Sequence, residues 1–228
     1  MSEFSKPMKM KAVLFDFNGT LFFDTSFHLE AWAKIYNEYH GGAGEAPDRG
    51  FYCGPCNDVI IRRLAPQLSE EERNECSAHK EALYREICMK NPQKLHLTAG
   101  AEKLFEVLEE KEIPFALATA SIRANVDFYY QTFGLDWWFE RNLCVYDDGS
   151  YADKGEMQLE AARRLDVKFS ECIVVEDSAT AIGFARKNGA GLIVGIGETE
   201  VHPELIAAGA DCCICDFTEF DLSWIFDK

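Results

Sequence analysis

Residues 11–21 read Lys-Ala-Val-Leu-Phe-Asp-Phe-Asn-Gly-Thr-Leu, an apolar run that ends in Asp16 and passes at once into Asn18-Gly19-Thr20. The apolar part predicts a buried strand, and Asn-Gly-Thr is typical of the turn that follows one. We therefore expect Asp16 at the C-terminal tip of a strand, where ligands bind in open parallel sheets. Asn18 stands where a second carboxylate would complete an acid/base pair, and an amide cannot exchange a catalytic proton at neutral pH.

Three later segments also bring chemical groups to predicted strand or helix tips. The run Phe115-Ala-Leu-Ala-Thr-Ala-Ser121 ends in hydroxyls, Lys154 opens a helical stretch, and Cys172-Ile-Val-Val-Glu-Asp-Ser178 ends in two carboxylates. Each segment has an ordinary structural explanation, because turn residues and helix-terminal charges are common. Their order and spacing together indicate a functional site.

The wider pattern predicts an α/β protein. Strands are expected at 11–17, 113–119, 172–176, 191–196 and 211–215, and helices at 26–40, 57–65, 69–90, 100–111, 123–133, 155–165 and 179–188. From residue 100 onward helix and strand alternate, which favours a parallel sheet covered on both faces. We therefore expect a Rossmann-like parallel sheet core, residues 1–23 and 96–228, with an inserted α-helical cap domain at 24–95.

The four segments resemble the haloacid dehalogenase superfamily, in the branch of β-phosphoglucomutases and small phosphatases. The resemblance implies that Asp16 is the nucleophile and forms an aspartyl-phosphate. It implies Mg²⁺ as cofactor, held by the Asp16 carboxylate, the Asn18 backbone carbonyl and Asp177. Glu176 is expected to orient the metal-bound waters.

The resemblance also implies the groups that would hold the phosphoryl group. Thr119 and the backbone amide of Ala120 would bind it, Lys154 would neutralise its charge, and Ser121 would serve as the N-cap of the next helix. The family places a proline soon after this lysine, whereas here Gly155 follows it.

Two cap positions are candidates for substrate binding. His28 lies one turn before Trp32, where β-phosphoglucomutases also carry His and Trp, and its side chain titrates near neutral pH. Asn57 stands where those mutases use an arginine to bind the distal phosphate.

Composition narrows the class of partner. The net charge of −16 argues against nucleic acid and anionic membranes as partners. The resemblance implies a small phosphorylated substrate, and the sequence gives no indication of protein partners. Nine cysteines, mostly within apolar runs, and an N-terminus without an apolar signal segment predict a cytoplasmic protein.

We therefore predict a Mg²⁺-dependent phosphatase for a small phosphorylated metabolite such as a sugar phosphate, slow because Asn18 replaces the acid/base residue. A phosphosugar mutase and a non-catalytic phosphate-binding or regulatory protein of the same fold are the alternatives. The carboxylates Glu176 and Asp177 speak against a metal-free dehalogenase, and a phosphonate hydrolase would need an imine-forming cap lysine. Cys53-Gly-Pro-Cys56 matches the thioredoxin tetrapeptide, but without the surrounding βαβ pattern.

Overall fold

A computed structural model describes residues 9–41, 47, 49–52 and 56–226. The chain divides into two compact units. The core unit comprises Met1–Phe23 and Leu97–Lys228, and the cap unit comprises Asp24–His96. Among the described residues, no helix is both long enough and apolar enough to cross a membrane.

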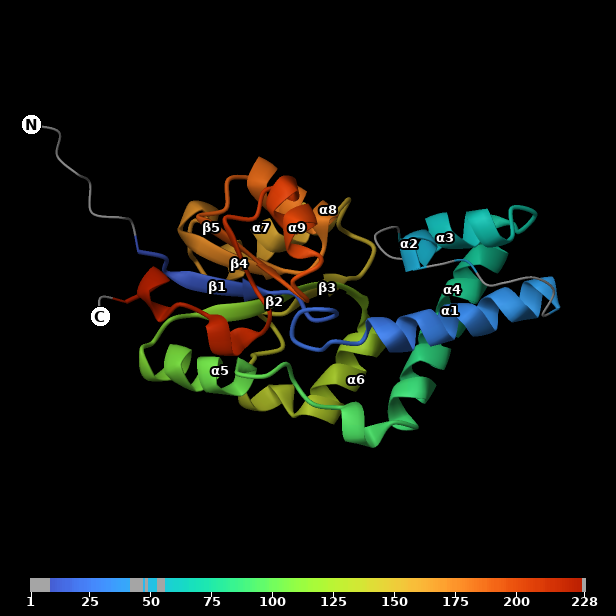
Figure 1. Ribbon diagram of the computed structural model, residues 1–228, viewed down its shortest axis with the longest axis horizontal. Helices are drawn as coiled ribbons and strands as arrows, with labels where there is room; N and C mark the ends of the chain where they lie inside the picture. Colours follow the sequence, from blue (N-terminus) through green and yellow to red (C-terminus); the bar gives the residue numbers. More distant parts are fainter. Residues whose placement is uncertain (1–8, 42–46, 48, 53–55, 227–228) are drawn as a thin grey trace, which may run out of the picture. The chain divides into compact units, whose positions relative to one another are not determined.

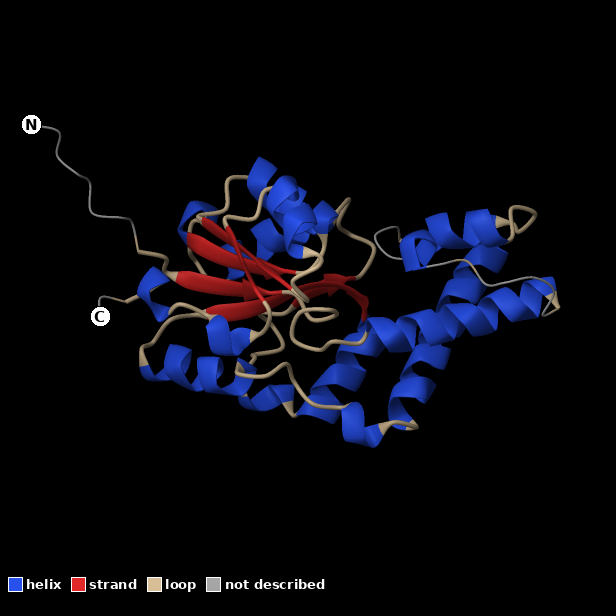
Figure 2. Cartoon of the chain, in the orientation of Figure 1, coloured by secondary structure: helices blue, strands red, loops and turns tan. Residues whose placement is uncertain are grey.

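The core unit is built on a parallel sheet of six strands in its described part (Figures 1 and 2). The strands are β1 (Ala12–Phe15), β2 (Phe115–Ile122), β3 (Val145–Asp147), β4 (Cys172–Glu176), β5 (Leu192–Ile196) and β6 (Cys212–Ile214). Their order in the sheet is β3-β2-β1-β4-β5-β6, and each neighbouring pair is parallel. The predicted α/β fold class is confirmed.

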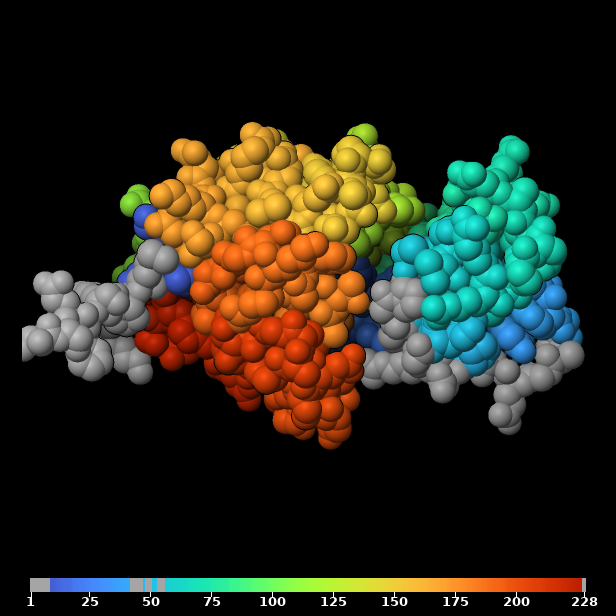
Figure 3. All heavy atoms as spheres, turned by 90° about the horizontal axis from the view of Figure 1, so that it is seen from above, coloured from blue at the N-terminus to red at the C-terminus, as the bar shows by residue number. Residues whose placement is uncertain are grey.

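Helices cover both faces of this sheet. In Figure 1, α5 (Ala101–Glu110) and α6 (Arg123–Phe133) lie on one side, and α7 (Lys154–Arg164), α8 (Ala179–Lys187) and α9 (His202–Ala208) lie on the other. In the space-filling view of Figure 3, atoms in the yellow to red colours of α7, α8 and α9 form a continuous cover on the second side. Short 3₁₀ helices complete the unit at Leu135–Trp137, Phe169–Glu171, Phe217–Glu219 and Leu222–Trp224.

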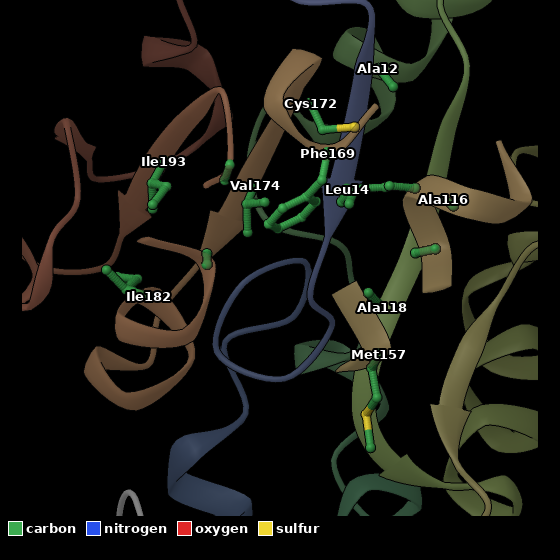
Figure 4. Packing of buried hydrophobic residues seen from close by; sticks show 14 of the residues in the cluster. Ala12, Leu14, Ala116, Ala118, Met157, Phe169, Cys172, Val174, Ile182 and Ile193 are labelled. Carbon is green, nitrogen blue, oxygen red and sulfur yellow. The ribbon is translucent and has the colours of Figure 1, made fainter. Parts of the chain in front are cut away.

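Side chains of β1 point alternately to the two helical layers. Ala12 and Leu14 join a cluster with Met157 of α7 and Ile182 of α8 (Figure 4). Phe15 lies instead among aromatic rings, with its centroid 5.5 Å from that of Phe105 in α5. Because both faces of the strand are buried, its sequence is a continuous apolar run that ends only at the polar tip.

In the described residues of the cap unit, all regular secondary structure is helical. Its elements are α1 (Thr25–His40), α2 (Arg49–Tyr52), α3 (Asn57–Leu64), α4 (Glu70–Met89) and a 3₁₀ turn at Pro92–Lys94. Ser69 caps α4 as expected, through a capping box in which its hydroxyl accepts from the Glu72 amide and the Glu72 carboxylate accepts from the Ser69 amide. Trp32, Ile35, Ile60 and Ile61 lie in the apolar cluster that joins α1 to α3.

The structure contains elements that the sequence pattern did not predict. Strand β3 has only three residues and α9 only seven, so neither produces a clear periodic signal. Strand β2 continues to Ile122, three residues beyond its expected end.

Candidate active site

The candidate site lies where the strand order of the sheet reverses. Strands β1 and β4 are neighbours, while the chain runs from β1 to β2 and β3 on one side and crosses over to β4 on the other. Asp16 directly follows β1. Glu176 is the last residue of β4, and Asp177 directly follows it. One carboxylate oxygen from each of these three residues lies within 4.8 Å of the other two. The fold therefore gathers three carboxylates at the switch point of the sheet.

Lys154, the first residue of α7, places its ammonium among these carboxylates. Its Nζ forms an ion pair with Asp16 Oδ1 and lies 3.1 Å from Glu176 Oε1. Burial disfavours the charged amine, but the nearby charges of Asp16 and Glu176 outweigh that effect and raise the pKa of Lys154. The direction of this shift favours the positively charged form of Lys154 beside Asp16.

Glu176 is fully enclosed at the end of β4, with 1% of its surface exposed. Burial raises the pKa of its carboxyl to about 7, and the positive charge of Lys154 offsets only part of that rise. Gln158, one turn along α7 from Lys154, is also buried, and its Nε2 donates to Glu176 Oε1 at 3.4 Å. Glu176 is thus oriented by two groups from the same helix.

Gly19 brings the turn after β1 directly against Asp177. A Cβ atom added at Gly19 would lie 2.1 Å from Asp177 Oδ2, and the φ of +71° is one that favours glycine. The Asp177 carboxylate therefore packs against the Gly19 backbone. It occupies the space that a side chain at position 19 would need.

Thr119 and Ser121, the hydroxyl residues of β2, lie at the same end of the sheet as Asp16, but Ser121 differs from its predicted role. Thr119 is buried and Ala120 is exposed beside it. Ser121 is not the N-cap of α6, which is Ile122 without a side-chain cap, so that prediction is wrong. Because the strand continues through position 121, the Ser121 side chain points back into the unit and donates to Asn18 Oδ1 at 2.5 Å.

The residues of this cluster fit a magnesium ion. Their side chains offer only oxygen ligands, the donor type that hard divalent cations prefer. The single ammonium of Lys154 can neutralise only one of the three carboxylates, and a divalent cation would balance the remaining negative charge. Asp16 and Asp177 would be ligands, with Glu176 beside them; the Asn18 backbone carbonyl remains a predicted ligand.

In the cap unit, the predicted residues His28 and Asn57 belong to a second polar cluster. Lys80 Nζ lies 2.7 Å from His28 Nδ1 and 2.8 Å from Glu81 Oε1. Asn57 Nδ2 donates to Glu81 Oε1 at 2.8 Å and to Ser77 Oγ at 3.0 Å. Both predicted residues are therefore hydrogen-bonded within the cap itself.

The charges of this cap cluster are buried. Burial lowers the pKa of the Lys80 ammonium, although the carboxylates of Glu81 and Asp24 oppose the shift. Burial alone would raise the pKa of Glu81, but Lys80 and its other partners lower it to about 2. His28 Nε2 lies 3.3 Å from Asp24 Oδ2, which also accepts from Tyr84 at 2.5 Å.

Several residues of both clusters were not predicted. These residues are Gln158 in the core and Lys80, Glu81 and Tyr84 in the cap. All lie inside helical stretches, where the sequence does not distinguish a residue that faces a site from one that faces solvent or core. The only available signal was spacing, since Gln158 is one turn from Lys154. Of the proposed thiol pair, Cys56 is exposed and Cys53 lies outside the described residues.

Comparison with known proteins identifies relatives over nearly the whole chain. Validoxylamine A 7'-phosphate phosphatase of Streptomyces hygroscopicus is 24% identical over 92% of this chain and 95% of its own length. The 2-deoxyglucose-6-phosphate phosphatase 1 of Saccharomyces cerevisiae is 26% identical over 96% of this chain and 91% of its own. Both relatives are named as phosphatases of phosphorylated compounds.

Solved structures show the same fold. A haloacid dehalogenase hydrolase of family IA, variant 3, from Entamoeba histolytica has a TM-score of 0.88 and 33% identity, covering 94% of this chain and 97% of that one. The β-phosphoglucomutase of Clostridium difficile has a TM-score of 0.77 at 20% identity, covering 94% and 95%. A model of the haloacid dehalogenase-like hydrolase family matches residues 10–189, well over half of the sequence. The chain therefore belongs to the haloacid dehalogenase-like hydrolases, as its four motifs predicted.

Proposed function

We propose that the protein is a Mg²⁺-dependent phosphatase that acts on a small phosphorylated metabolite through an aspartyl-phosphate at Asp16. The observation that carries the proposal is the meeting of Asp16, Lys154, Glu176 and Asp177 at the switch point of the sheet. A nucleophilic carboxylate, a fixed cation and further acidic ligands are the parts that phosphoryl transfer requires.

In the proposed first step, an oxygen of the Asp16 carboxylate attacks phosphorus, and the bond between phosphorus and the ester oxygen breaks. The carboxylate becomes an acyl phosphate, and the bonding electrons leave with the substrate oxygen. Lys154 is placed to stabilise the charge on the phosphoryl oxygens as the nucleophile loses its own. Bound Mg²⁺ would add positive charge at the phosphoryl oxygens.

In the second step, water attacks phosphorus, inorganic phosphate departs and the Asp16 carboxylate is regenerated. Thr119 and the backbone amide of Ala120, an exposed residue, are the proposed binding groups for the phosphoryl oxygens. Asn18 has no exchangeable acid proton for the departing oxygen in the first step. The enzyme is therefore expected to be slow on esters with poor leaving groups.

The relatives support a carbohydrate-like substrate. The Streptomyces phosphatase is named for validoxylamine A 7'-phosphate, and the yeast phosphatase is named for 2-deoxyglucose-6-phosphate. The cap residues His28 and Asn57 are the proposed groups for the part of the substrate beyond the phosphate. A sugar phosphate with a primary phosphate ester is thus the substrate class that we propose.

A non-catalytic phosphate-binding protein is the second candidate, because the acid/base position is occupied by Asn18 and its amide is hydrogen-bonded to Ser121 and Tyr129. The two candidates differ in turnover. Retention of Asp16 and Lys154, which serve covalent catalysis rather than binding alone, favours the enzyme.

The test is hydrolysis of p-nitrophenyl phosphate and of a panel of sugar phosphates, with Mg²⁺ and with excess chelator. We expect turnover that needs Mg²⁺ and falls by more than about 10³-fold in Asp16→Asn, since this variant keeps the shape but loses the nucleophile. Unchanged thermal stability of the variant would show that folding is intact. Phosphate binding without turnover would instead support the non-catalytic candidate, and transfer to a second sugar hydroxyl would identify a mutase.

A further inference from the structure

The side chain of Asn18 is part of a closed ring of hydrogen bonds in the core unit. Asn18 Nδ2 donates to Tyr129 Oη at 2.8 Å, and Ser121 Oγ donates to Asn18 Oδ1 at 2.5 Å. The hydroxyls of Ser121 and Tyr129 lie 3.3 Å apart. If Tyr129 donates across that gap, each of the three groups donates once and accepts once around the ring.

The ring is held in place from two sides. The Tyr129 ring stacks on Phe17, with centroids 4.0 Å apart and planes 14° from parallel, and both side chains are buried. On the other side, Thr119 Oγ1 donates to Ser121 Oγ at 3.2 Å and accepts from the Ser121 amide at 3.3 Å. Because buried aromatic and strand residues have little freedom to rotate, the two hydroxyls are fixed before any substrate binds.

The three ring members come from three different elements. Asn18 lies in the turn after β1, Ser121 in the last part of β2 and Tyr129 in α6. The hydrogen bonds therefore connect the turn that carries the proposed catalytic position to two rigid parts of the fold. Without these hydrogen bonds, a partly buried asparagine in a glycine-containing turn would sample several rotamers.

From this geometry we propose that Ser121 and Tyr129 are positioning residues that hold the side chain of residue 18 within the ring and out of proton transfer. The inference rests on the proposed phosphatase function and deepens it. A carboxylate at position 18 would accept from both hydroxyls, because Ser121 Oγ already donates to Asn18 Oδ1 and Tyr129 Oη lies 2.8 Å from Asn18 Nδ2 and 3.2 Å from Asn18 Oδ1. Restoring the acid alone is then insufficient, and the ring must also be opened.

The kinetic test compares Asn18→Asp with Asn18→Asp/Tyr129→Phe, on an alkyl phosphate and on p-nitrophenyl phosphate. Only the alkyl ester needs a proton on its leaving oxygen. We expect less than about threefold gain for the single variant and at least about tenfold for the double variant on the alkyl ester, with little change on the aryl ester. Equal gains in the single and double variants would overturn the proposal.

Tyr130→Phe provides the matched control. Tyr130 is the next residue of α6, is equally buried at 1% exposure, and has no bond to Asn18 among those that form the ring. The Asn18→Asp/Tyr130→Phe variant should behave as Asn18→Asp alone. A gain in this control equal to that of the Tyr129 double variant would show a loosened helix rather than an opened ring, and would overturn the proposal.

A second readout does not depend on activity. The side-chain NH₂ of Asn18, observed by ¹⁵N NMR, should exchange with solvent about fivefold or more faster in Tyr129→Phe and in Ser121→Ala than in the parent or in Tyr130→Phe. Unchanged exchange in the ring variants would overturn the positioning role. If exchange accelerates but no variant hydrolyses any ester, positioning is supported and the phosphatase function fails.

Discussion

The core and the cap each bury a lysine among carboxylates, but the two clusters differ in how their charges are balanced. In the core, Lys154 faces three carboxylates that lie within 4.8 Å of one another. In the cap, Lys80 contacts Glu81 and His28, while neutral donors on Asn57 and Tyr84 satisfy the cluster's carboxylates.

The difference indicates different roles. The core cluster has more carboxylates than cations, and the proposed divalent cation would balance that excess of negative charge. In the cap cluster, the ammonium of Lys80 pairs with Glu81, and neutral donors on Asn57 and Tyr84 hydrogen-bond to the carboxylates of Glu81 and Asp24 within the same unit. A buried ion pair such as Lys80–Glu81 fixes the positions of neighbouring side chains, whereas an excess of negative charge at a strand tip attracts a cation.

The largest expected effect is on stability, at Lys80. Lys80→Met leaves the Glu81 carboxylate buried without its cation, and should lower the free energy of unfolding by about 3–5 kcal/mol in urea denaturation. The double variant Lys80→Met/Glu81→Gln removes both charges and should recover part of the loss. If the double variant is no more stable than Lys80→Met, the charges of Lys80 and Glu81 do not compensate each other within the cap.

Lys154→Met should act mainly on turnover. Loss of the cation beside Asp16 is expected to reduce kcat by about 10²–10³-fold, equivalent to about 2.7–4 kcal/mol of transition-state stabilisation. Lys187→Met, at an exposed position on α8, is the control and should leave kcat unchanged. Equal kinetic effects at the two lysines would show that Lys154 acts only through net charge.

Magnesium should stabilise the protein through the core cluster alone. At about 100 times its dissociation constant, Mg²⁺ should add about 2.7 kcal/mol, which raises Tm by about 5–10 °C for a chain of this size. The shift, measured by calorimetry, should shrink in Asp177→Asn and persist in Glu81→Gln. The reverse pattern would place the cation in the cap.

The smallest expected effect is a pH dependence of stability that arises in the cap. The pKa of Glu81 is about 2 in the folded protein against an ordinary value of 4.5. Its ionised form therefore stabilises the fold fully above pH 4.5, and this contribution is lost as the pH falls toward 2. Between pH 5.5 and pH 3, the parent should lose about 1–3 kcal/mol more than Glu81→Gln. Parallel Tm profiles of the two proteins would contradict this assignment.

The sequence predicted the fold because its central strands are buried on both faces. Runs such as Ala12–Phe15 and Cys172–Glu176 show up as continuous apolar segments with polar tips, and those tips carry Asp16 and Glu176. Short edge elements such as β3 lack that contrast and were missed. Motif residues at strand ends were thus predictable in position, while their roles remain predictions.

Contacts made by helical residues could not be predicted in the same way. Tyr129 and Tyr130 are adjacent and equally buried, yet only the side chain of Tyr129 joins the ring around Asn18. Lys80 and Glu81 stand in a helix with many charged residues, a pattern typical of a solvated face, but both are buried. Which of these residues turns inward depends on packing between helices, and local sequence does not encode it.

The close approach of Gly19 to Asp177 has an evolutionary consequence. Most active-site walls are side chains, which mutation can enlarge or trim in small steps. Here the group that faces Asp177 is the main chain of Gly19, which leaves no room for a Cβ atom. Any side chain at position 19 would collide with Asp177, so a substitution there would abolish the present arrangement rather than adjust it. Descendants of this protein that acquire new substrates would therefore have to vary other positions of the candidate site.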